Sequence, residues 1–201
     1  MIGGSQPASN AVVAVLAGLA LVALVTTSIL SISDEPRLLT RSTVHVALLG
    51  YAAALCLFMR AAPPDWEVRT VLGSSMRWLW TWACVAFLLH VACAFHFVHG
   101  WSHDHAFEQT RRESGVGEGL WVNYLFMLAW AGDVAWWWIS SMSYARRPRG
   151  IDRALHGFLL FIAFNATVVF EAGAVRWAGL IGFVALAVMF CRRRMASMTR
   201  Q

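Results

Sequence analysis

The sequence predicts an all-α, polytopic transmembrane helix bundle of about six spans with both termini in the cytoplasm. Three observations carry this prediction. The chain of 201 residues is 59% hydrophobic and only 13% charged, whereas a soluble domain is about half apolar and about a quarter charged. The apolar residues form runs long enough to cross a bilayer. The arginines gather in the segments between those runs, on alternate sides of the expected membrane.

Spanning a bilayer takes roughly 20 mostly apolar residues, with about 17 as a minimum. Six segments meet this requirement, and together they predict one integral membrane domain over residues 1–201. The expected spans are 11–33, 43–59, 78–99, 119–141, 154–170 and 174–191. The first has no basic residue before it and is longer than the apolar core of a signal peptide, which favours a retained helix. Pro63 and Pro64 indicate a short interfacial helix over 64–74.

The basic residues predict orientation, and the chain has no lysine, so all sixteen are arginine. Eleven of them fall near 60–77, 146–153 and 192–200, and five fall near 37–41, 111–112 and 176. The side richer in arginine is expected to be cytoplasmic. A lysine-free chain is typical of GC-rich bacterial coding, so the bacterial inner membrane is the expected location. Tryptophans at 78, 80 and 82 and at 136–138 fall near the expected inner boundary, where indoles concentrate.

Histidine placement is the main functional signal. Five of the seven histidines fall between positions 90 and 105. On one continuous helix, His96, His99 and His103 would stack over two turns at the periplasmic end. Neutral imidazoles in that arrangement suit Fe, Cu or Zn, with Asp104 and Glu108 near enough to assist. Gly100 and Ser102 leave open the alternative that the helix ends and His103 and His105 begin a new one.

A haem b is the alternative cofactor, because two histidines from different helices can ligate its iron. His45 lies at a depth similar to His96 and His99, and His90 lies deeper, so either is a candidate partner. The leading hypothesis is therefore a metal- or haem-binding membrane protein that acts as a redox component. His96, His99 and His103 are the expected ligands, and His45, His90 or His105 completes the set. The run includes an H-x-x-x-H spacing but lacks the later H-x-x-H-H boxes of membrane desaturases, so that family is not assigned.

Two rival functions remain open from the sequence. Asp133 is an ionisable residue at membrane depth, and together with Asn123 and Asn165 it predicts the path of a small-solute or ion transporter. Alternatively, the chain is a non-catalytic membrane subunit whose loops dock partner subunits or a second copy. The expected partner in every case is the lipid bilayer, and the basic segments are too dispersed to predict nucleic-acid binding. His156 is expected at the inner interface, and the four cysteines are expected to be free.

Overall fold

The computed structural model describes residues 36–198, and within that range every regular element is helical. This confirms the all-α class for the described part of the chain. The first predicted span, 11–33, lies outside the described residues. The elements in chain order are α2 Pro36–Phe58, α3 Pro63–Trp66, α4 Val71–Cys93, the π-helical turn η1 Ala94–Val98, α5 His103–Ser114, α6 Gly119–Ile139, α7 Ser141–Ala145, α8 Arg149–Phe164, the π-helical turn η2 Asn165–Val169, and α9 Gly173–Met198.

Four helical stretches in the described residues are long and apolar enough to cross a membrane: Leu39–Phe58, Val71–Val98, Arg149–Val169 and Gly173–Arg193. They correspond to the second, third, fifth and sixth predicted spans, which supports a membrane protein. The fourth predicted span matches α6, a helix of 21 residues. Its mean hydropathy is lowered by one Asn, one Asp and five Trp, so it is not among the four. The count of six spans stays a prediction.

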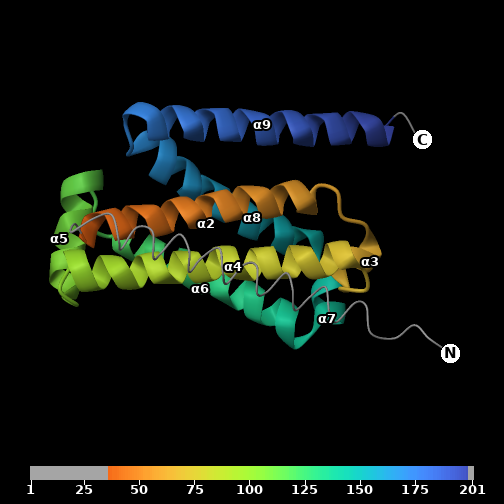
Figure 1. Ribbon diagram of the computed structural model, residues 1–201, viewed down its shortest axis with the longest axis horizontal. Helices are drawn as coiled ribbons and strands as arrows, with labels where there is room; N and C mark the ends of the chain where they lie inside the picture. The colour runs from red at the N-terminus through yellow and green to blue at the C-terminus, as the bar shows by residue number, and fades with distance from the viewer. Residues whose placement is uncertain (1–35, 199–201) are drawn as a thin grey trace.

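The long helices run side by side as a bundle, with α5 at one end and α3 and α7 at the other (Figure 1). Helices α2 and α4 are antiparallel and pack closely. A Cβ atom on Gly50 of α2 would lie 2.9 Å from the Cβ of Ala83 on α4. Small residues at such a contact bring two membrane helices into direct backbone contact. Helix α9 lies at the edge of the bundle and exposes most of its apolar side chains (Figure 1).

The core is aromatic and lies toward the α3–α7 end. The largest fully buried side chains are Trp80, Trp137, Tyr144, Met76 and Leu159. Trp80 and Trp137 each come from one of the two tryptophan-rich segments, so one indole of each group faces the protein interior. Their neighbours Trp78 and Trp138 remain partly exposed. The tryptophan groups therefore serve both the core and the boundary of the bundle.

The predicted interfacial helix over 64–74 is wrong. Helix α3 ends at Trp66, Val68 adopts a left-handed backbone with φ of 60°, and Thr70 is extended with φ of −122°. Thr70 then caps α4, its side chain accepting from the backbone N–H of Gly73 at 2.9 Å. Because this cap begins α4 at Val71, the third span starts seven residues earlier than the predicted position 78. The hydroxyl of Thr70 also donates to Asp65.

The three segments richest in arginine lie at one end of the bundle, the end that holds α3 and α7 (Figure 1). The segment around α3, the segment between α7 and α8, and the final turns of α9 all meet there. The structure thus gathers the residues that the positive-inside rule groups together. Which side of the membrane this end faces stays a prediction.

Replacing Gly73 by alanine is expected to destabilise the protein by about 1–3 kcal/mol, because the added methyl would overlap the backbone carbonyl of Asp65. Thermal unfolding in detergent measures the effect. Gly132→Ala is the matched control, since no heavy atom outside its own helix lies within 4 Å of that methyl. Equal melting temperatures for the two variants would contradict the close packing of α3 on α4.

A reporter that fluoresces only in the cytoplasm, fused after Gln201, is expected to be bright if the arginine-rich end is cytoplasmic. The same reporter inserted at Gly115, between α5 and α6, is expected to be dark, because that connector lies at the opposite end of the bundle. The reverse pattern would invert the predicted orientation.

Candidate functional site

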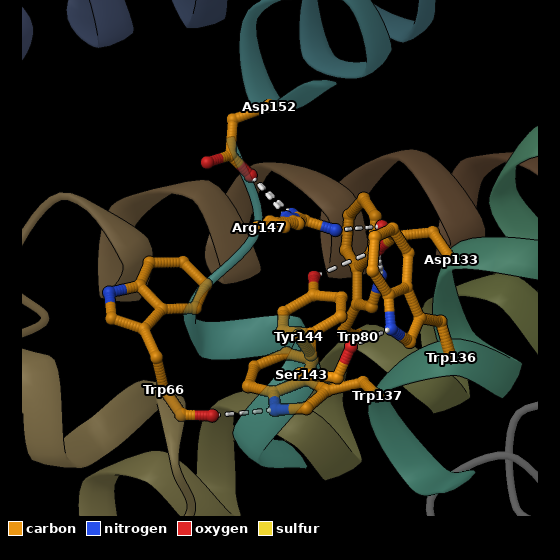
Figure 2. A network of polar contacts seen from close by, with 9 residues as sticks. All are labelled: Trp66, Trp80, Asp133, Trp136, Trp137, Ser143, Tyr144, Arg147 and Asp152. Atoms are coloured by element: carbon orange, nitrogen blue, oxygen red, sulfur yellow. Dashed lines mark hydrogen bonds and ion pairs between the residues drawn. The ribbon is translucent and has the colours of Figure 1, made fainter. Parts of the chain in front are cut away.

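Asp133 is the centre of a buried polar network (Figure 2). It lies on α6 with 7% of its surface exposed. Its Oδ2 accepts one hydrogen bond from the indole N–H of Trp80 and one from the hydroxyl of Tyr144, each at 2.9 Å. Its Oδ1 forms an ion pair with the guanidinium of Arg147. Both carboxylate oxygens are therefore satisfied, as a buried charge requires.

Arg147 extends the network to the start of α8. Its Nε donates to Asp152 at 2.6 Å, and its Cζ lies 3.8 Å from the centre of the Tyr144 ring. Burial alone would lower the pKa of Arg147, but the adjacent carboxylates of Asp133 and Asp152 outweigh burial and raise it. Burial raises the pKa of Tyr144, and Asp133 adds to the effect. At neutral pH the network thus holds a charged arginine and a neutral tyrosine.

The network joins four elements, since Trp80 belongs to α4, Asp133 to α6, Tyr144 to α7 and Asp152 to α8. A second layer adds Trp137, whose indole donates to the carbonyl of Trp66 at 3.0 Å, and Trp136, whose indole donates to Ser143 at 3.2 Å (Figure 2). Sequence reasoning identified Asp133 but missed Trp80, Tyr144 and Arg147 as its partners. A buried acid needs an opposite charge, yet nothing in sequence spacing points to an arginine fourteen residues later.

The three candidate transport residues are not brought together. Asn165 donates to the carbonyl of Phe161 one turn earlier, at 2.8 Å, where η2 begins. Asn123 is exposed on α6, ten residues and about 15 Å of helix from Asp133. The Nε of Arg176 donates a hydrogen bond to the backbone carbonyl of Glu171 at 2.8 Å. No polar path centred on Asp133 is assembled from the predicted residues.

The histidine-rich segment is not one continuous helix, so the predicted stack of His96, His99 and His103 does not form. Helix α4 passes into η1 and stops at His99, and both Gly100 and Trp101 take left-handed φ values, 58° and 60°. Ser102 then caps α5, its hydroxyl accepting from the backbone N–H of His105 at 3.2 Å. His103 and His105 therefore begin a new helix, which is the alternative that the sequence left open.

The turn gives each histidine its own neighbours. His96 accepts from the indole of Trp101 at 3.3 Å, and the Nδ1 of His103 lies 2.8 Å from the hydroxyl of Tyr124 on α6. His99 and His105 instead face each other, with ring centroids 5.7 Å apart and planes at 89°. The Nδ1 atom of His99 is buried and has no hydrogen-bond partner.

The surroundings of His99, burial above all, favour its neutral form. Burial and the neighbouring His105 lower its pKa, and Glu113 on α5 opposes them. The neutral imidazole is the form that binds metals. Of the other acids named from the sequence, Glu108 is paired with Arg111 at 3.1 Å. Asp104 falls in the first turn of α5, where its charge suits the helix dipole.

The two candidate haem ligands that precede the histidine turn, His45 and His90, lie on α2 and α4. The Nδ1 of His90 donates to the carbonyl of Thr40 at 2.8 Å, while His45 is exposed. Gly50, five residues after His45, and Ala83, seven residues before His90, bring the two helices into direct contact, which leaves no room at that level for a macrocycle between them. His156 was expected at the inner interface, but its ring packs within the aromatic core. Its ring centroid lies 5.6 Å from that of Trp80 and 5.8 Å from that of Phe58.

No group of three or more His, Cys, Asp or Glu side chains is placed to hold a metal ion within residues 36–198. Any site built on the described histidines would therefore have two protein ligands, with solvent or a further group completing the shell.

An open groove of about 430 Å³ lies beside the turn. Its lining is apolar except for His103 and Tyr124, and consists of Val91, Phe95, Trp101, His103, Tyr124, Met127 and Leu128. The four cysteines are free, as expected.

Comparison of the chain with protein-family models, curated proteins and solved structures finds no match. What the chain does must therefore be argued from its own residues.

Replacing Asp133 by alanine is expected to cost about 3–5 kcal/mol, because it leaves the charge of Arg147 buried without its main partner. Chemical or thermal unfolding in detergent measures this loss. Asp152→Ala removes the other carboxylate of the network, but that side chain is 41% exposed, and the expected cost is below about 1 kcal/mol. Similar losses for both variants would show that Asp133 does not hold the network together.

Proposed function

We propose that the chain is a membrane protein that binds a transition-metal ion through His99 and His105, at the turn between η1 and α5. The observation that carries the proposal is the pair of facing imidazoles, of which His99 has a buried, unpartnered Nδ1 atom. A buried ring nitrogen without a partner loses its hydrogen bond to water, and a bound cation would restore a partner to it.

The spacing of the two rings fits this role. Histidine nitrogens bind Zn²⁺ at about 2.0–2.1 Å, so two imidazoles that share a tetrahedral ion have ring centroids about 5 Å apart. The observed separation is 5.7 Å. The carboxylate of Glu113 is close enough to influence His99 electrostatically.

A site with two protein ligands and open positions suits the uptake, exchange or redox cycling of an ion rather than a structural role, which calls for four closed ligands. Its place at the end of the bundle puts it beside the exposed turn formed by Gly100, Trp101 and Ser102. Orientation with this end toward the periplasm, as the arginines predict, would give a protein that handles a metal outside the cytoplasm.

The transporter hypothesis receives less support, because Asp133 is fully paired and its predicted partners lie elsewhere. The subunit hypothesis is favoured by α6, where Asn123 is exposed beside the exposed apolar residues Trp121, Val122 and Leu125. An exposed amide near the middle of an apolar face is suited to bonding a neighbouring helix. A partner that co-purifies in stoichiometric amount, and is lost in Asn123→Leu, would favour this second candidate.

The test is titration of the detergent-purified chain with Zn²⁺ and Cu²⁺ against a chromophoric chelator. Wild type is expected to bind one equivalent. His99→Ala and His105→Ala are each expected to weaken binding about 100-fold or more, since loss of an outer-shell partner already costs about 10- to 100-fold. An absorption spectrum of the same sample reports any haem.

His96→Ala is the matched control, because His96 is exposed three residues away and contacts only the neighbouring Phe97 and Trp101 rings. It should bind like wild type. Equal weakening in all three variants, or no binding by wild type, would contradict the proposed site. A Soret band would instead identify haem as the ligand of the histidines.

A further inference from the structure

A group of residues at the arginine-rich end, which we name the Arg77 cluster, consists of Arg77, Trp78, Thr81 and Trp82 on α4 and Trp138 on α6. The guanidinium of Arg77 stacks on the Trp138 ring, with Cζ 3.8 Å from the ring centre. Trp138 is fixed from both sides. Its indole donates to Thr81 at 2.9 Å, and its ring meets Trp78 edge to face at 4.6 Å. Trp78 in turn stacks on Trp82.

The cluster holds N–H donors that lack acceptors. The Nε atom of Arg77 and the indole nitrogen of Trp82 are both buried without a hydrogen-bond partner. Within residues 36–198 Arg77 also has no carboxylate partner, in contrast to Arg147, Arg111 and Arg69. A guanidinium held in place by an aromatic ring, with its charge unneutralised, is a ready-made receptor for an anion. Buried donors of this kind call for an acceptor ligand.

Position along the bundle identifies the kind of anion. Arg77 lies in the second turn of α4, about 9 Å from the first residue Val71, so it is close to the membrane boundary. Indoles that are partly exposed at this level mark the headgroup region. The phosphate of a lipid lies at the same depth, with acyl chains that would lie along the apolar surfaces of α4 and α6.

We propose that the Arg77 cluster binds the phosphate of an anionic phospholipid, with the guanidinium of Arg77 as the anchor. Trp138 holds the guanidinium in its orientation, and Trp78 and Trp82 provide the aromatic surface at headgroup level. This site is independent of the metal site, which lies at the opposite end of the bundle (Figure 1).

Native mass spectrometry of the full chain, titrated with phosphatidylglycerol and with phosphatidylcholine, tests the proposal. Wild type is expected to prefer phosphatidylglycerol. Arg77→Gln is expected to weaken phosphatidylglycerol binding about fivefold, the effect of one arginine near a charged surface, and to leave phosphatidylcholine unchanged. Arg77→Lys keeps the charge but loses the planar stack, so its affinity should fall between the two.

Arg153→Gln is the matched control. Arg153 is exposed at the same end of the bundle and bonds only the carbonyl of Arg149, so its loss changes net charge equally without touching the cluster. The proposal is overturned if Arg77→Gln keeps the wild-type preference for phosphatidylglycerol. It is also overturned if Arg77→Gln and Arg153→Gln weaken phosphatidylglycerol binding equally. Displacement of the lipid by inorganic phosphate at equal concentration would also overturn it, because the site would then be one for small anions. Should Arg77→Gln fail to fold, an Arg77→Lys affinity equal to wild type would likewise contradict it.

Discussion

The buried ion pair between Asp133 and Arg147 is the constraint on which the arginine-rich end of the bundle depends. A carboxylate held away from water requires a cation and hydrogen-bond donors, and each of these comes from a different element. Trp80 fixes α4 against α6, Tyr144 fixes the short α7, and Arg147 reaches α8 through Asp152. One carboxylate thereby sets the relative positions of four helices, in a setting where apolar packing alone gives little preference between lipid and protein.

The opposite end of the bundle is organised differently. Here the backbone, rather than a buried charge, determines geometry. The π-helical turn at 94–98 and the left-handed residues Gly100 and Trp101 turn the chain sharply, and Ser102 restarts it as α5. As a result His99 meets His105 across a turn, and the histidines do not stack along one helix.

Individual residues show how far sequence reasoning reached. It located the candidate spans that correspond to α2, α4, α8 and α9, identified Asp133 as unusual, and raised the possibility that Gly100 ends a helix. It failed at Val68, where a β-branched residue in a left-handed conformation interrupts the expected interfacial helix. It also failed at His156, which neighbouring charges suggested was interfacial but which packs against Trp80 and Phe58. Local sequence does not encode contacts between residues about 76 or 98 positions apart in the chain, as these are.

The sequence by itself determined that the chain is helical and suited to a membrane, because apolar run length and composition are properties of the segment alone. It also determined which segments carry arginine and therefore which ends should lie together. Only the tertiary structure decided that Asp133 is paired, that His99 meets His105, and that Arg77 rests on Trp138 with no acid beside it among the described residues. Each of these depends on the rotation of one helix about its axis relative to its neighbour. That angle is set by side-chain packing across the whole bundle, and no single segment specifies it.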